Sequence, residues 1–131
     1  MSETFDLAFH WDPMCPFAWL TSLWMDQVID QRGLNVDWRF ISLRILNADV
    51  DYETEFPPEY IEGHGAGLRL LRVAAAVRDA EGPAPMRPLY KAMSAPLFEC
   101  PPPTDNRTIP PAAEPDRVRV LLTACGLSAD Y

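Results

Sequence analysis

Residues 5–40 carry the sequence FDLAFHWDPMCPFAWLTSLWMDQVIDQRGLNVDWRF, and this stretch decides the fold. Apolar residues alternate over 5–11 and again over 36–40, which is the period of a half-buried strand. Between these two segments, apolar residues recur at helical spacing at Leu20, Leu23, Trp24 and Val28. Gly33 stands where a left-handed residue would end that helix after about four turns. The stretch therefore predicts a strand, a helix and a second strand, with the strands parallel and joined by a right-handed crossover.

The strand pattern stops after residue 47, and the next part of the chain predicts helices. An acidic, turn-rich connection over 49–58 precedes a helix predicted over 68–80, which a glycine closes. A short helix is predicted over 89–94, and Pro96 is expected to terminate it.

The last part of the chain begins with the proline-rich sequence CPPPTDNRTIPP over 100–111, which predicts an extended, irregular segment. A helix is predicted over 116–125, with Pro115 before it and Gly126 after it. Ser128 resembles the cap of a further helix, three residues before the last residue of the sequence.

The composition narrows the class of partner. The chain has 131 residues, a usual size for one domain, and a formal net charge of -8 with no cluster of Lys or Arg. Because phosphate binding needs concentrated positive charge, neither a nucleic acid nor an anionic membrane is expected as a partner. No apolar run approaches a membrane span, and the N-terminal residues MSETFD lack the features of a signal peptide. Three cysteines fit a reducing compartment, so a cytoplasmic protein is expected.

Cys15 is the residue on which chemistry is predicted to depend. It follows the first strand pattern and precedes the first helix, in the string WDPMCPFAWL. The unpaired N–H groups and partial positive charge at a helix N-terminus stabilise a thiolate, and Pro16 suits the first helical turn. The sequence thus predicts a nucleophilic thiol, and the structural alternative is a buried, inert cysteine at a strand-helix junction.

At this point the sequence resembles the DsbA-like branch of the thioredoxin superfamily, and within it the actinobacterial mycothiol-dependent reductase and nitroreductase family. The matching strings occur in the family's order across nearly the whole chain: DPMCPFAWLTSLW (12–24), ISLRILN (41–47), PEYIEG (58–63), PLYKAM (88–93) and LLTACGLSAD (121–130). The resemblance implies an α/β fold of thioredoxin type, interrupted by a helical insertion.

The resemblance also implies roles for individual residues. Cys15 becomes the attacking cysteine, acting with a low-molecular-weight thiol, with mycothiol the expected one. Asn47 and Tyr60 fall on family motifs that line the cleft beside it, where mycothiol and an aromatic acceptor would lie. Each has a structural alternative, because Asn can cap a turn and Tyr can anchor a loop through its hydroxyl.

Ala18 departs from the family pattern, because it occupies the place of the second cysteine in a CxxC motif. Cys15 then has no adjacent thiol, so a mixed disulfide must be resolved by a second molecule of thiol. The departure also favours a related branch, the kappa-type glutathione transferases and chromene-carboxylate isomerases. Phe17, Trp19 and Trp11 are expected either as an apolar cleft wall or as ordinary core aromatics.

A second departure concerns the end of the sequence, since a thioredoxin fold needs two further strands and a helix. Residues 1–131 are therefore expected to form a single incomplete domain, with a strand-helix-strand unit over 1–47 and a helical insertion over 48–131. None of the 14 prolines sits in the strand context that the family's cis-proline loop requires. The helix that starts near Phe17 is expected to have one face left uncovered. The missing strands are expected to come from further sequence of the same protein or from a partner chain such as a second copy.

The other cysteines and histidines are expected to be bystanders. Cys100 is a remote candidate to pair with Cys15, and Cys125 is predicted to pack as a small hydrophobe. His10 and His64 match no zinc pattern, so no metal is expected.

Three charged residues lie on or beside the predicted helices. Arg69 and Arg72 are expected to form a solvated basic face, with attraction of an anionic substrate as the alternative. Asp12 is expected to act as a turn or capping residue rather than as an acid catalyst, because a carboxylate near Cys15 would oppose thiolate formation.

The function expected from these observations is a cytoplasmic thiol-disulfide oxidoreductase whose substrates are small-molecule disulfides or electrophiles such as nitroaromatics. The alternatives are a kappa-like thiol transferase or isomerase and an inactive thioredoxin-like binding module.

Overall fold

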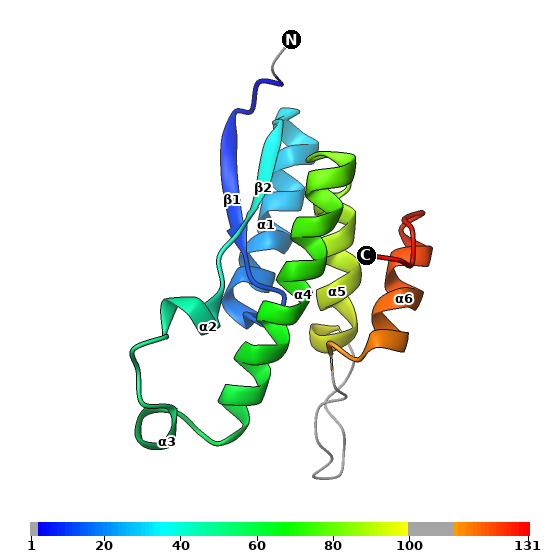
Figure 1. Cartoon of the computed structure of the whole chain (residues 1–131). Helices are drawn as coiled ribbons and strands as arrows, with labels where there is room; N and C mark the ends of the chain where they lie inside the picture. The colour runs from blue at the N-terminus through cyan, green and yellow to red at the C-terminus, as the bar shows by residue number, and fades with distance from the viewer. Residues whose placement is uncertain (1–2, 100–111) are drawn as a thin grey trace.

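The computed structural model describes residues 3–99 and 112–131. Within these residues the chain is a mixed α/β structure of two strands and six helices (Figure 1). In chain order the elements are β1 (Leu7–Trp11), α1 (Pro16–Arg32), β2 (Val36–Phe40), α2 (Leu43–Leu46), α3 (Tyr52–Glu55), α4 (Glu59–Glu81), α5 (Met86–Phe98) and α6 (Pro115–Ala124).

The two strands form a parallel pair, as predicted. Leu7 pairs with Val36 and Trp11 with Phe40, so the whole of β1 lies in register with β2. Figure 1 shows α4 and α5 running side by side next to the strands, with α6 on the outer side of α5. Helix α5 packs against α1, β2, α4 and α6, which makes it the centre of the helical layer.

Helix α1 begins and ends where the sequence predicts. Cys15 is its N-cap, Pro16 is its first residue, and Gly33 terminates it with a φ of 65°, in the left-handed region that favours glycine. The face turned to the core carries Trp19, Ser22 and Met25. The apolar residues whose spacing predicted the helix lie on a different face. Leu20 and Trp24 are exposed there, so that side of the helix is left largely uncovered, as expected.

The core is built around Tyr90 of α5. Its ring is stacked on Trp11 at a centroid distance of 4.6 Å and lies 5.9 Å from Trp38 and 6.1 Å from Trp19. All four aromatic side chains are buried. Because they come from β1, β2, α1 and α5, the cluster fixes the strand-helix-strand unit against the central helix.

Helix α4 also holds β2 through an ion pair. Arg78 donates to Asp37 Oδ1 at 2.9 Å and to the carbonyl oxygen of Trp38 at 3.2 Å, and Arg39 donates to Asp37 Oδ2 at 2.6 Å. Burial alone would raise the pKa of Asp37, but the two guanidinium groups outweigh it and lower the pKa below its ordinary value. Asp37 is therefore a buried carboxylate that stays charged and joins the strand to the helix.

The prediction for α4 was too short, because the helix begins at Glu59 rather than at residue 68. The intervening sequence EGHGAG contains three glycines and resembles a loop. In the structure Ala66 and Gly67 face the core, and a side chain on Gly67 would collide with Asp12. Close packing thus requires a small residue here.

The acidic connection before α4 contains one helical turn, α3, which Asp51 caps by accepting from the backbone N–H of Glu53 at 3.1 Å.

The prediction that Pro96 ends its helix was wrong, since α5 continues to Phe98. Proline removes one backbone donor from the last turn of the helix. The packing of that turn offsets the loss: Phe98 stacks on Trp19 at 6.0 Å, and Leu97 packs against the core.

At the C-terminal end, α6 confirms the helix predicted after Pro115, and Gly126 follows it with a φ of 72°. Ser128 does not open a further helix; its hydroxyl oxygen accepts from the backbone N–H of Asp130 in a turn. The irregular segment predicted over 100–111 lies outside the described residues.

Candidate active site

Cys15 stands at the N-terminus of α1. Its Sγ accepts a hydrogen bond from the backbone N–H of Ala18 at 3.4 Å, and its own N–H donates to the carbonyl oxygen of Asp12 at 3.1 Å. The thiol is half-buried and Pro16 beside it is exposed. The sulfur thus takes the position of an N-cap acceptor for the first turn of α1.

The two residues after Pro16 are Phe17 and Ala18, so the thiol of Cys15 has no second cysteine of a CxxC motif beside it. The Phe17 side chain is 78% exposed immediately after the cysteine turn. Ala18 contributes only its backbone N–H. By contrast Trp11 and Trp19 are buried in the core around Tyr90, so they are core aromatics rather than an exposed cleft wall.

The second described thiol, Cys125, is a different kind of residue. It caps the C-terminal end of α6, packs against the core, and its Sγ lies 3.9 Å from the carbonyl oxygen of Pro88. Burial raises the pKa of Cys125, which keeps it protonated at neutral pH. Cys15 and Cys125 are both free thiols, and Cys100 lies outside the described residues.

Asp12 holds the turn before Cys15. It is fully buried; its Oδ1 accepts from the backbone N–H of Met14 at 2.8 Å, and its Oδ2 accepts from the backbone N–H of Leu43 at 2.9 Å. The turn role was predicted, whereas the bond to Leu43 joins residues 31 apart and has no local signal in the sequence. Burial raises the pKa of Asp12 above its ordinary value, although both backbone N–H groups and the nearby His64 act to lower it.

Helices α4 and α5 both contact the turn formed by residues 12–14. A Cβ placed on Gly67 would lie 2.6 Å from Asp12 Oδ1 and 3.1 Å from Met14 Cγ, so the α4 backbone touches the turn directly. From α5, the buried Ser94 hydroxyl donates to the carbonyl oxygen of Pro13 at 2.9 Å. The three residues before Cys15 are thus fixed by two helices distant in sequence.

Asn47 and Tyr60 belong to α2 and α4, the helices whose residues Leu43 and Gly67 contact Asp12. Asn47 is the C-cap of α2, and its side-chain amide donates to the carbonyl oxygen of Leu43 at 2.8 Å, the structural role that the sequence left open. Tyr60 lies in the first turn of α4, 43% exposed, with its ring stacked on Phe56 at 5.5 Å. Helices α2 and α4 pack against each other, so the two residues belong to neighbouring segments.

A buried pair that sequence reasoning missed lies behind Tyr60. The hydroxyl of Tyr52 and Nδ1 of His64 are 2.8 Å apart, and the rings of Phe56 and Tyr60 pack edge-on against the imidazole. Burial lowers the pKa of His64, with Arg44 acting the same way and Asp12 opposing. His64 is therefore a neutral, packed residue.

His10, in contrast, is exposed on β1, and the described residues contain no group of three metal ligands.

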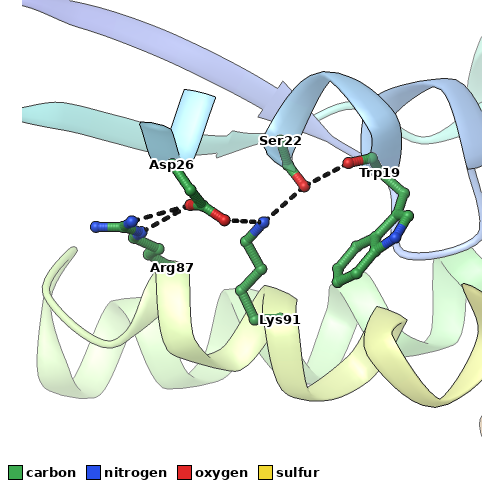
Figure 2. A network of polar contacts seen from close by, with 5 residues as sticks. All are labelled: Trp19, Ser22, Asp26, Arg87 and Lys91. Atoms are coloured by element: carbon green, nitrogen blue, oxygen red, sulfur yellow. Dashed lines mark hydrogen bonds and ion pairs between the residues drawn. The ribbon is translucent and has the colours of Figure 1, made fainter. Parts of the chain in front are cut away.

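The first turns of α1 are anchored to α5 by the network drawn in Figure 2. Lys91 Nζ donates to Ser22 Oγ at 2.7 Å and lies 2.6 Å from Asp26 Oδ2, while Arg87 donates to Asp26 Oδ1 at 2.9 Å. The Lys91 ammonium also lies 4.7 Å from the ring centroid of Trp19. The helix that carries Cys15 at its end is thus held to the central helix by charge as well as by apolar packing.

Arg69 and Arg72 of α4 are not part of this network. Arg69 forms an exposed ion pair with Glu62 at 2.6 Å, and Arg72 is exposed, as expected for a solvated face. A cavity of about 370 Å³ lies between α4, α6 and the last residues, lined among others by Arg69, Val118 and Tyr131, and not by Cys15.

The family to which this arrangement belongs is shown by comparison with known proteins. The family model for Rv2466c-like proteins, described as "Mycothiol-dependent nitroreductase Rv2466c", matches residues 14–119. The chain belongs to this family. The match to the Rv2466c-like family begins one residue before Cys15 and extends into α6.

One relative of this Rv2466c-like chain is an uncharacterised protein, Rv2286c, of Mycobacterium tuberculosis (strain ATCC 25618 / H37Rv). It is 36% identical over 70 residues, which make up 53% of this chain and 29% of the relative. The matched part of the chain therefore covers less than a third of that relative's length. None of the helices described in the Rv2466c-like chain is both long and apolar enough to cross a membrane.

Proposed function

We propose that this Rv2466c-like chain is part of a DsbA-like thiol oxidoreductase of thioredoxin fold. It uses Cys15 with a low-molecular-weight thiol, mycothiol, to reduce small disulfides or electrophiles such as nitroaromatics. The observation that carries the proposal is the position of Cys15 Sγ at the N-terminus of α1, bonded to the N–H of Ala18. It is supported by the family's description as a mycothiol-dependent nitroreductase.

The chemistry proceeds in two exchange steps. The Cys15 thiolate attacks one sulfur of a disulfide R–S–S–R′, forming Cys15–S–S–R and releasing R′–S⁻, which takes a proton from water. A thiolate of mycothiol then attacks the mixed disulfide at the sulfur of R and restores the Cys15 thiolate as leaving group. Since Ala18 offers no thiol, the second step is intermolecular.

The surrounding residues have defined tasks in this scheme. In this proposal the exposed ring of Phe17 forms part of an apolar cleft wall. Asn47 and Tyr60 lie along the same cleft, which receives the hydroxyl-rich thiol and an aromatic acceptor. Residues 1–47 form the strand-helix-strand part of the thioredoxin domain, and residues 48–131 form its helical insertion. The strands and helix that complete the sheet come from further sequence or from a second copy, and the protein acts in the cytoplasm.

The absence of a thiol at Ala18 favours a second candidate, a kappa-type thiol transferase or isomerase. Such an enzyme would activate the thiol of its cofactor without forming a disulfide to Cys15.

The two candidates separate in one experiment. The protein is treated with mycothiol disulfide, digested and examined by mass spectrometry. A mycothiol adduct on Cys15, absent from Cys15→Ser and retained in the control Cys125→Ser, is expected. A protein that catalyses thiol transfer while Cys15 stays unmodified would favour the kappa-type enzyme. An inactive binding module would show neither an adduct nor a thiolate absorbance from Cys15 at neutral pH.

A further inference from the structure

We propose that Asp12 is a positioning residue, whose carboxylate fixes the relative placement of the segments that carry Cys15, Asn47 and Tyr60. This inference rests on the proposed function, in which those three residues form the reactive cleft. Asp12 itself acts through the backbone.

The first two segments are joined by the two oxygens of one carboxylate. Oδ1 accepts from Met14 N, in the residue adjacent to Cys15, and Oδ2 accepts from Leu43 N, in the first residue of α2. Leu43 in turn accepts the amide of Asn47 through its carbonyl oxygen. Hence the path from the cysteine turn to Asn47 runs through three hydrogen bonds, all between 2.8 and 2.9 Å.

The third segment is placed by contact rather than by a hydrogen bond. Gly67 presents bare backbone to Asp12, and any Cβ there would lie 2.6 Å from Oδ1 and 3.2 Å from Oδ2. Because two backbone N–H groups hold the carboxylate, it cannot swing away to make room. The distance between α4 and the cysteine turn is therefore set by Asp12, and Tyr60 lies two turns earlier on the same helix.

The surroundings of Asp12 support positioning rather than proton transfer. Its side chain is fully buried, both oxygens are occupied by backbone donors, and within residues 3–99 and 112–131 no Lys, Arg or His forms an ion pair with it. A group in this environment presents no free oxygen to a substrate. Its two oxygens serve instead as acceptors for two partly buried N–H groups that would otherwise lack partners.

The test uses Asp12→Asn, in which one oxygen remains but the amide nitrogen cannot accept the second N–H. Asp37→Asn is the matched control, because Asp37 is also a buried carboxylate with two hydrogen-bond partners but belongs to the β2–α4 contact. Gly67→Ala is a second variant that displaces α4 while keeping the carboxylate, so a failure of Asp12→Asn to fold leaves the inference testable.

Two rates are measured: formation of the Cys15 adduct with mycothiol disulfide, and alkylation of Cys15 by iodoacetamide. In Asp12→Asn and Gly67→Ala we expect adduct formation to slow by about tenfold to a hundredfold, because small displacements of binding groups have effects of that size. Alkylation, which needs no cleft, should change by less than about threefold, and Asp37→Asn should alter neither rate. Equal slowing of both rates in the Asp12 and Gly67 variants would indicate a general loss of structure and overturn the inference, as would unchanged adduct formation.

Amide hydrogen exchange of the folded proteins separates this inference from the proposed function. In Asp12→Asn the N–H of Met14 or of Leu43 should exchange faster, whereas unchanged protection of both would refute the positioning role. If wild-type protein forms no mycothiol adduct, the proposed function fails. The exchange data and the alkylation rate then still decide whether Asp12 holds the turn.

Discussion

Ser94 on α5 donates a hydrogen bond of 2.9 Å to the carbonyl oxygen of Pro13, two residues before Cys15, and both side chains are fully buried. The bond crosses 81 residues of sequence. A carbonyl group in the interior has no access to water, so it depends on the Ser94 hydroxyl for a partner. The central helix therefore contributes directly to the conformation of the cysteine turn.

Replacing Ser94 by Ala should lower the free energy of unfolding by about 1–3 kcal/mol, since it leaves a buried acceptor without a donor. Urea denaturation followed by circular dichroism measures the change. Thr123→Ala is the control, because Thr123 also donates to a carbonyl oxygen, that of Arg119, but on an exposed surface. Equal stability of the two variants would contradict the role assigned to Ser94.

Two glycines of α4 should respond in opposite ways to the same substitution. Gly67→Ala should destabilise the protein by about 1–3 kcal/mol, because the new Cβ meets the pinned carboxylate of Asp12. Gly63 has no atom within 4 Å of its Cβ position, so Gly63→Ala should raise stability by about 0.5–1 kcal/mol through helix propensity. Thermal melts of both variants check the signs, and a stabilised Gly67→Ala would show that α4 does not touch the turn.

Asp37 should make stability depend on acid. Its pKa in the folded protein is lowered, on balance, by Arg39 and Arg78 against the opposing effect of burial. The charged form therefore stabilises the fold fully above the unfolded pKa of about 3.9, and this contribution disappears as the pH falls through the lower folded value. Asp37→Asn should be less stable than wild type by about 1.5–3 kcal/mol at neutral pH, and the difference should shrink in strong acid. Urea denaturation of wild type and Asp37→Asn at neutral pH and in strong acid measures this difference in the free energy of unfolding. A difference that grows on acidification would refute the argument.

Asp26 should be the most sensitive member of the network between α1 and α5, because it is the partner of both Lys91 and Arg87 (Figure 2). Removing it by Asp26→Ala leaves two partly buried cations without a carboxylate. Lys91→Met and Arg87→Met each leave one ion pair intact. We expect losses of about 1–2 kcal/mol for Asp26→Ala and about half of that for each cation variant. Chemical denaturation in low and high salt measures these losses, and an Asp26→Ala loss no larger than either single cation variant would count against the network.

The parts of the fold that the sequence predicted are those with local signals. The start of α1 depends on Cys15 and Pro16, its end on Gly33, and the strands on alternation over a few residues. Each of these rules acts within one turn of helix or one strand. The position of Cys15 at the start of α1 could be predicted for the same reason, since an N-cap is a local feature.

The parts that the sequence did not predict depend on contacts between distant residues. The glycines before residue 68 weaken a helix in isolation, but the close approach of Gly67 to Asp12 requires one of them. Pro96 ends an isolated helix, but Phe98 packs on Trp19 and continues it. The bonds from Asp12 to Leu43 and from Ser94 to Pro13 likewise join segments that no periodic pattern connects.

The uneven burial of the tryptophans gives the protein an internal optical reporter. Trp24 is 59% exposed on α1, whereas Trp11, Trp19 and Trp38 are at most 4% exposed. Fluorescence from Trp24 should be emitted at longer wavelength and be quenched by acrylamide, while the three buried indoles should be shielded from the quencher. Any additional chain that covers the exposed side of α1 would shift the Trp24 emission to shorter wavelength and protect it from acrylamide. Binding of another segment or chain to that side of α1 could therefore be followed in solution without a label.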